Sequence, residues 1–174
     1  EGFPHFMLKE IHEQPAAIEQ TLFNRLDEGS RQLIFDRRTK RFLDALSPNE
    51  KFIIIACGTA YHAGLVAEYM LEECTRIPVD VDLASEFRYR GAQLGRDTTV
   101  IAITQSGETA DTLAGIQMAK AQGAKTLAIC NVMGSSIARE VGAVLYTHAG
   151  PEIAVASTKA YTSQITALAL LTLY

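Results

Sequence analysis

The 174-residue sequence has no tryptophan, and its three cysteines are odd in number and far apart. A flavin-binding electron carrier needs aromatic rings beside its cofactor, and the loops after the predicted strands offer only Tyr61. Separated cysteines within apolar runs are typical of unpaired thiols in a reducing compartment, so we expect Cys57, Cys74 and Cys130 to be reduced and the location to be cytoplasmic. Cys57 ends a strand and could be a nucleophile, but no neighbouring sequence supplies a base.

Positive charge is also scarce, with 16 Lys and Arg against 20 Asp and Glu and a formal net charge of −4. This balance gives no basic face for nucleic acid. The apolar run at 165–174 is interrupted by threonine and is shorter than the roughly 20 apolar residues that span a bilayer. We therefore expect no nucleic-acid or membrane partner. The absence of a leader and the uncapped apolar end favour a piece excised from a longer protein.

Several cofactor motifs are missing. Gly58 and Gly64 do not complete the G-x-G-x-x-G pattern of dinucleotide binding, and no G-K-[ST] follows Gly107. The four histidines are scattered and lack a second ligand at metal-binding spacing. We expect no cofactor and no metal.

From residue 51 onward, apolar runs alternate with helical patterns. Runs such as 52–56 have no polar face, which is typical of parallel strands covered by helices on both sides. The alternation predicts the α/β class, with a five-stranded parallel sheet sandwiched by helices. The predicted strands are 52–56, 79–83, 99–103, 126–130 and 143–147, and the predicted helices are 61–74, 85–90, 109–122, 135–141 and 157–174.

The first 46 residues predict a helical lead-in, and residues 47–174 predict the α/β domain. Within 5–28 we expect two helices separated by Pro15, with Gly29 ending the second, followed by a short helix at 39–46. The front helices show no basic stripe.

The segment 104–109 is the most informative feature of the chain. It follows an apolar strand, opens a helix and carries several hydroxyls. A helix N-terminus offers unpaired N–H groups and a positive dipole potential, so hydroxyls there can bind a phosphate without a cation or a metal. The alternative is local capping, with Ser106 as the N-cap and Glu108 complementing the dipole; the two roles are compatible.

Two further loops follow strands, at 57–64 and 149–159. Right-handed crossovers bring the carboxyl ends of parallel strands to one edge, so these loops are expected to lie beside 104–109. Thr59 can contribute a hydroxyl to a ligand, or can cap its own helix. Glu152 and Lys159 can take part in acid–base chemistry, although solvated charges at a helix start are the favoured interpretation.

Taken together, these loops resemble the isomerase half of the glutamine–fructose-6-phosphate aminotransferase family, whose members make glucosamine 6-phosphate. The resemblance runs in order along nearly the whole chain. It rests on residues 9–15, 56–64, 104–113, 130–132, 134–136 and 150–160.

The resemblance implies the first of two sugar isomerase (SIS) domains, a flavodoxin-like fold, and a site for fructose 6-phosphate or glucosamine 6-phosphate. By motif position, the loop at 104–109 is expected to bind the phosphate, and the loop at 57–64 is expected to add one further contact. The loop at 149–159 is expected to line the sugar. The implied substrate-binding residues are Gly58, Thr59, Ala60, Thr104, Gln105, Ser106, Thr109, Val155, Ala156 and Ser157. The family commonly has serine where Ala60 and Thr104 stand, which predicts somewhat weaker binding because Ala60 cannot donate a hydrogen bond.

In this family the reaction uses glutamine-derived ammonia, and its lysine, glutamate and histidine groups belong to a second SIS domain and a C-terminal tail. The resemblance therefore implies no catalytic residue in this chain, which is expected to bind ligand without turnover. Implied partners are the second SIS domain, the glutaminase domain and a second copy in a homodimer. The alternative is a SIS-type sensor of sugar phosphates that regulates a partner.

Overall fold

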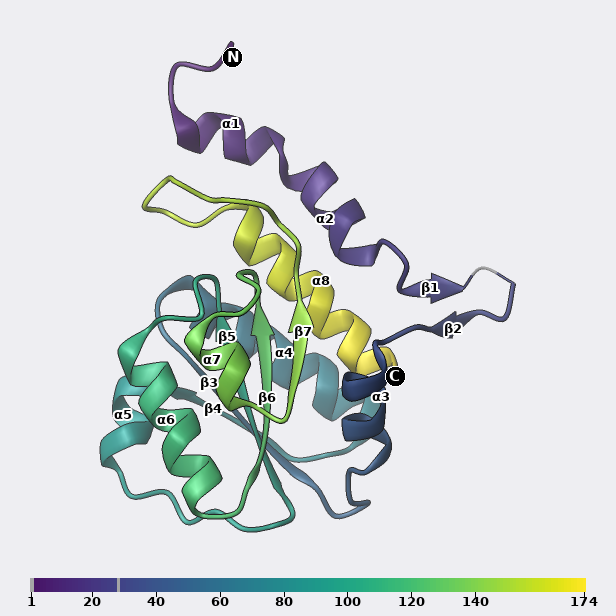
Figure 1. Ribbon diagram of the computed structural model, residues 1–174, viewed down its shortest axis with the longest axis vertical. Coiled ribbons are helices and arrows are strands. Elements are labelled where there is room, and N and C mark those ends of the chain that lie inside the picture. The colour runs from purple at the N-terminus through teal and green to yellow at the C-terminus, as the bar shows by residue number, and fades with distance from the viewer. Residues whose placement is uncertain (1, 28) are drawn as a thin grey trace.

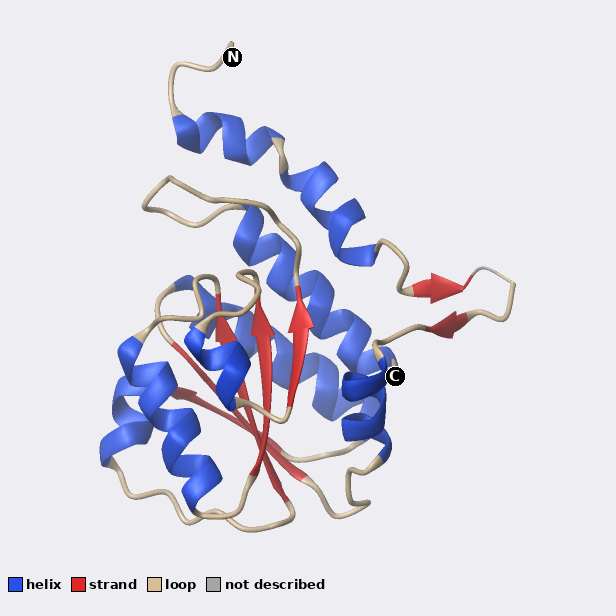
Figure 2. Cartoon of the chain, viewed as in Figure 1, coloured by secondary structure: helices blue, strands red, loops and turns tan. Residues whose placement is uncertain are grey.

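The computed structural model describes residues 2–27 and 29–174, so Glu1 and Glu28, the last residue of the predicted second helix, lie outside it. Its centre is a five-stranded sheet in the spatial order β4-β3-β5-β6-β7, with every neighbouring pair parallel (Figures 1 and 2). This confirms the predicted fold class. The strands are β3 (Lys51–Ala56), β4 (Val79–Leu83), β5 (Thr98–Thr104), β6 (Lys125–Cys130) and β7 (Ala143–Tyr146).

Helices cover both faces of the sheet, and each face has its own apolar core. Successive side chains of a strand point to opposite faces. Ile54 therefore packs in the core with α4 and α8, whereas Ile55 packs with α5, α6 and α7, and both side chains are fully buried. Burying one such side chain stabilises the fold by about 1.5–3 kcal/mol. The covering helices are α4 (Thr59–Thr75), α5 (Ala84–Tyr89), α6 (Ala110–Ala121), α7 (Ser136–Glu140) and α8 (Lys159–Leu173).

The order of the strands locates a binding edge. The chain passes from β3 outward to β4 and then returns to the other side of β3 to form β5. At such a reversal the loops after the two central strands diverge to opposite faces, which leaves a crevice at their carboxyl ends. The loops after β3 and β5 are those predicted to bind the ligand.

The front segment differs from its prediction. Helices α1 (Phe6–His12) and α2 (Gln14–Leu22) form, with Pro15 in the first turn of α2, but α2 ends at Leu22 and does not reach residue 28. A small hairpin of β1 (Leu26–Asp27) and β2 (Gln32–Leu33) follows, and Gly29 lies in its turn. The Asp27 carboxylate accepts the Gly29 N–H at 3.0 Å, which stabilises that turn in place of further helix.

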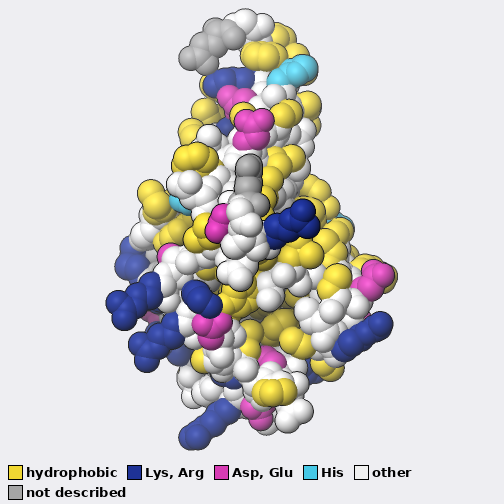
Figure 3. Space-filling view, turned by 90° about the vertical axis from the view of Figure 1, so that its right-hand side faces the viewer, with side chains coloured by type: hydrophobic (Ala, Val, Ile, Leu, Met, Phe, Trp, Pro, Cys, Tyr) yellow, Lys and Arg dark blue, Asp and Glu magenta, His cyan; other side chains and the backbone are white. Residues whose placement is uncertain are grey.

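Helix α3 (Arg37–Asp44) begins two residues before its predicted start because Asp36 caps it, accepting the N–H groups of Arg38 and Thr39. The expectation that the front helices lack a basic stripe is wrong for α3, which exposes a cluster of basic side chains. Figure 3 views the side of the molecule on which α3 lies, and Lys and Arg side chains are visible in the lower half of this view among acidic and uncharged ones. The exposed members on α3 are Arg37, Arg38, Lys40 and Arg41.

Candidate functional site

A cavity of about 240 Å³ lies at the carboxyl ends of β3 and β5, where the three predicted loops meet. All the residues predicted to bind substrate line it, except Gly58 and Ala156. The sequence analysis did not include several other residues of its wall. The lining residues are Cys57, Thr59, Ala60, Ile103, Thr104, Gln105, Ser106, Thr109, Glu152, Ala154, Val155, Ser157 and Gln164.

Two hydroxyls of the loop after β5 accept hydrogen bonds from backbone N–H groups of the same loop. Thr104 Oγ1 accepts the Gly107 N–H at 3.1 Å, and Ser106 Oγ accepts the Glu108 N–H at 3.1 Å. In both bonds the hydroxyl oxygen is the acceptor, so each O–H remains available to donate to a ligand. Both roles foreseen for these hydroxyls, local structure and donation to a ligand, are therefore compatible in this geometry.

Two details of the capping interpretation are wrong. The N-cap of α6 is Thr109, without a side-chain cap, and Ser106 lies outside the helix. Glu108 does not complement α6; its carboxylate accepts the Ser136 N–H at 2.8 Å, at the start of α7. Hydrogen bonds from Ser136 hold the pKa of the Glu108 carboxyl below its ordinary value. Glu108 is therefore a charged capping group that ties the β5–α6 loop to the neighbouring loop.

Gly107 makes the shape of this loop possible. Its φ is +68°, and a Cβ at this position would lie 2.0 Å from Ser135 Oγ. The backbone of 104–109 therefore passes directly over Ser135, which only a residue without a side chain permits.

Two helix N-termini lie at the cavity. Thr59 and Ala60 are the first residues of α4, and Thr109 precedes the first residue of α6. Thr59 does not cap α4, because Gly58 occupies that position and makes no side-chain cap, and Thr59 is exposed. Each helix N-terminus carries about half a positive elementary charge. Neutral donors and two helix N-termini thus face one small cavity, an arrangement suited to an anion.

Among the described residues that line the cavity, Glu152 is the one charged residue, and it organises the last loop. Its carboxylate accepts the N–H groups of Thr158 at 2.8 Å and Ala160 at 3.2 Å, and the Ser157 hydroxyl at 2.9 Å. Thr158 is the N-cap residue of α8 and Ala160 lies in its first turn, so Glu152 acts as a capping group for this helix. It is half-buried, and the expectation of a solvated charge is wrong for it.

Lys159 is not a solvated charge either. Its side chain is 6% exposed, and Nζ lies 2.7 Å from a carboxylate oxygen of Glu13, the residue between α1 and α2. Glu10 of α1 also reaches this loop, since its carboxylate accepts the Ile153 N–H at 2.6 Å. In Figure 1 the loop between β7 and α8 rises toward α1. The lead-in therefore fixes the loop that closes one side of the cavity.

The cysteines behave as unpaired thiols in the described structure. Cys130 is fully buried, and burial raises the pKa of its thiol, which keeps it protonated. Cys57 is half-buried at the cavity wall with Sγ 3.9 Å from Thr112 Oγ1. Its sulfur lies beside a hydroxyl and not beside a base.

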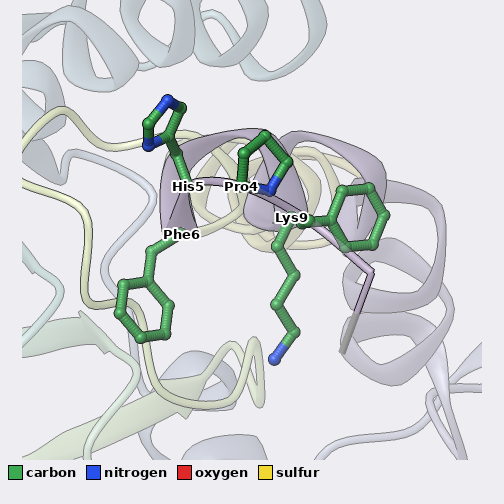
Figure 4. A pocket seen from close by; sticks show the side chains of 5 residues that line it. Pro4, His5, Phe6 and Lys9 are labelled. Carbon is green, nitrogen blue, oxygen red and sulfur yellow. The ribbon is translucent and has the colours of Figure 1, made fainter.

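A larger hollow of about 560 Å³ lies at the N-terminal end, lined by Phe3, Pro4, His5, Phe6 and Lys9. Figure 4 shows its labelled side chains pointing in different directions around α1, and none of the predicted site residues lines it. It has no convergent polar groups, so the smaller cavity is the better candidate.

Within residues 2–27 and 29–174, no group of three or more His, Cys, Asp or Glu side chains could hold a metal ion. Among the same residues, no helix combines the length and apolarity needed to cross a bilayer.

Comparison with known proteins identifies the family of the chain. The family model described as the SIS domain matches residues 45–174. The chain is 56% identical over 174 residues to the isomerizing glutamine–fructose-6-phosphate aminotransferase of Caldanaerobacter subterraneus, and 55% identical over 173 residues to that of Streptomyces coelicolor. Each alignment covers 99% of this chain and 28% of the relative, so the chain spans little more than a quarter of these proteins.

Solved structures show the same architecture. The C-terminal domain of glucosamine-fructose-6-phosphate aminotransferase from Francisella tularensis superposes with a TM-score of 0.89 and 42% identity, covering 99% of this chain and 47% of that one. Glucosamine-6-phosphate deaminase from Thermotoga maritima, at 20% identity and a TM-score of 0.76, shares the fold, covering 97% of this chain and 48% of that one. With the family model matching most of its length, the chain belongs to the SIS domain family, and throughout that length it resembles the isomerase half of glutamine–fructose-6-phosphate aminotransferases.

Proposed function

We propose that the cavity after β3 and β5 binds a six-carbon sugar phosphate, fructose 6-phosphate or glucosamine 6-phosphate. The observation that carries the proposal is the meeting of hydroxyls from three separate loops in one cavity of about 240 Å³. The phosphate is held by the O–H groups of Ser106, Thr109 and Thr104 and by the N-terminus of α6. Thr59 adds a donor from α4, and Val155 to Ser157 line the sugar.

The chemistry favours a phosphate ester over a free cation or an uncharged sugar. The lining contains no Lys or Arg among the described residues, but it presents neutral donors in front of helix N-termini. Such donors stabilise a dianion without the desolvation of a buried cation. The carboxylate of Glu152 is occupied by Ser157, Thr158 and Ala160, so it does not oppose the phosphate as an unpaired charge.

We further propose that this site serves the conversion of fructose 6-phosphate and glutamine-derived ammonia to glucosamine 6-phosphate in amino-sugar biosynthesis. The support is the identity of 52–56% to relatives named for glutamine–fructose-6-phosphate aminotransfer. The partners are then a second SIS domain, a glutaminase domain and a second copy in a homodimer. Cytoplasmic location is part of the proposal, because a reducing compartment suits the unpaired cysteines.

In this proposal the 174-residue chain by itself binds its ligand but does not turn it over. The cavity wall supplies donors and one carboxylate that is already engaged as a helix cap, so no described group there is placed to move a proton. Glucosamine 6-phosphate formation from fructose 6-phosphate and ammonia by the purified chain would contradict this part.

Isothermal titration calorimetry of the chain with fructose 6-phosphate, glucosamine 6-phosphate, inorganic phosphate and unphosphorylated fructose tests the proposal. We expect both sugar phosphates to bind, inorganic phosphate to bind more weakly and fructose not to bind. The Ser106→Ala/Thr109→Val pair should lose about tenfold in affinity, from two neutral hydrogen bonds of about 0.5–1.5 kcal/mol each. Ser85→Ala, which removes a hydroxyl of α5 outside the cavity, is the matched control and should bind as the unmodified chain does.

A further inference from the structure

The wall of the cavity includes a glutamine whose buried amide oxygen has no hydrogen-bond partner among the described residues. Gln164 lies in the second turn of α8, and its side chain is 3% exposed. It lines the cavity, and its Oε1 has no hydrogen-bond partner within the described chain. Buried polar atoms are nearly always paired, because leaving a lone pair unsatisfied away from water costs folding free energy. An orphaned amide oxygen on the wall of a binding cavity therefore indicates a group that completes its hydrogen bonding with a ligand.

The position of Gln164 suits the sugar and not the phosphate. The phosphate donors lie on the loop after β5 and at the start of α6, whereas Gln164 comes from α8, the helix that follows the sugar-lining segment. An amide oxygen only accepts hydrogen bonds, so it repels a phosphate oxygen and attracts a hydroxyl. A phosphate anchored at Ser106 and Thr109 leaves the hydroxylated carbon chain to meet the remaining wall.

We propose that Gln164 is a specificity-determining residue whose Oε1 accepts a hydrogen bond from a hydroxyl of the bound sugar phosphate. This inference rests on the proposed function and adds to it the group that distinguishes a polyol phosphate from phosphate alone. A site built around a hydrogen-bonding partner rejects ligands that lack it, because the buried polar group is then left unpaired.

The test is Gln164→Met, a change that keeps the length of the side chain and removes its amide. Calorimetry of the chain with fructose 6-phosphate should show an affinity about tenfold lower, equal to about 1.4 kcal/mol. Inorganic phosphate should bind with unchanged affinity. The melting temperature without ligand should stay equal or rise, because the variant no longer buries an unpaired amide. A purely structural role predicts the opposite, a lower melting temperature and a parallel fall for both ligands.

Ser163→Ala is the matched control. Ser163 is the neighbouring residue of α8, and its Oγ is equally buried and unpaired, but it does not line the cavity. It should leave both affinities unchanged. Unchanged binding of fructose 6-phosphate by Gln164→Met, or a parallel fall for both ligands, overturns the inference while the proposed function stands. If the unmodified chain binds neither ligand, the proposed function and the inference both fall.

Discussion

Glu10 and Ile153 lie 143 positions apart and are joined by a 2.6 Å hydrogen bond in which the Ile153 N–H donates to a carboxylate oxygen of Glu10. The neighbouring Ala154 N–H also donates to this carboxylate. Glu10 is 2% exposed, so the bonds are shielded from water. A residue of the lead-in thereby fixes the backbone of a loop whose side chains line the cavity.

Removing this carboxylate should loosen the loop. For Glu10→Ala we expect an affinity for fructose 6-phosphate about tenfold lower, because hydrogen bonds to a charged acceptor contribute about 1.5–3 kcal/mol each to the ordered loop. Glu10→Gln keeps one amide oxygen and should recover much of the affinity. Calorimetry gives the affinities, and amide hydrogen exchange at Ile153 and Ala154 should accelerate in Glu10→Ala alone.

Glu19→Ala is the control for this effect, since it removes an exposed carboxylate from α2. Its affinity and exchange rates should match those of the unmodified chain. If Glu10→Ala binds fructose 6-phosphate as tightly as this control does, the lead-in has no part in positioning the loop.

Sequence patterns sufficed for the parts of the fold with strong local signals. The apolar run of β3 has no polar face, and it is buried from both sides as predicted. Gly123 has a φ of +84° directly after the Gln122 cap of α6, and glycine at this position is a common local signal for the end of a helix. Right-handed crossovers bring the carboxyl ends of parallel strands to one edge, so the edge where the loops meet was also predictable. The order of the strands in the sheet was not predicted.

Features that depend on distant contacts were not predictable from local patterns. The hairpin of β1 and β2 replaced the expected helix because Asp27 bonds its own turn. The role of Lys159 depends on Glu13, which lies 146 positions earlier. Gln164 shows only one local signal, a large polar residue within an apolar helix, and nothing in the sequence alone tells which way that side chain points.

Substitution of Gly107 should be far more damaging than substitution of a glycine with equal backbone strain. In Gly107→Ala the added Cβ would lie 2.0 Å from Ser135 Oγ, and the alanine would have to keep a φ of +68°. We therefore expect a loss of about 2–5 kcal/mol in the free energy of unfolding. Gly123→Ala also adopts a positive φ but has no atom within 4 Å of the new Cβ. It should cost about 1 kcal/mol. Urea denaturation measures both, and equal losses would show that the overlap with Ser135 is relieved at no cost.

The ion pair of Glu13 and Lys159 should make stability depend on pH in the acid range. The hydrogen bond from Lys159 holds the pKa of Glu13 below its ordinary value of 4.5 in the folded chain. The unfolded chain therefore takes up this proton first as the pH falls. The stabilisation is complete above pH 4.5 and is lost as the pH falls through the lower, folded pKa.

Glu13→Gln removes that titration and leaves the buried Lys159 without a counter-charge. We expect a loss of about 3 kcal/mol at pH 7, at the lower end of the effect of breaking a buried pair, because Glu13 itself is partly exposed. Chemical denaturation between pH 3 and pH 7 should show a smaller fall in stability for the variant than for the unmodified chain. Parallel curves for the two proteins would mean that another carboxylate controls acid stability.

The variant Ala60→Ser tests whether the N-terminus of α4 contributes to ligand binding. Ala60 is 7% exposed and lines the cavity one residue after Thr59, so a hydroxyl added there faces the proposed phosphate. One further neutral hydrogen bond contributes about 0.5–1.5 kcal/mol, which corresponds to an affinity about twofold to twelvefold higher for fructose 6-phosphate. Because the donor faces the phosphate, inorganic phosphate should gain by a similar factor, unlike the response expected of Gln164→Met. Calorimetry with both ligands separates these cases. An unchanged affinity for both would place the phosphate away from α4. The protein groups that bind the phosphate would then all lie on the loop after β5.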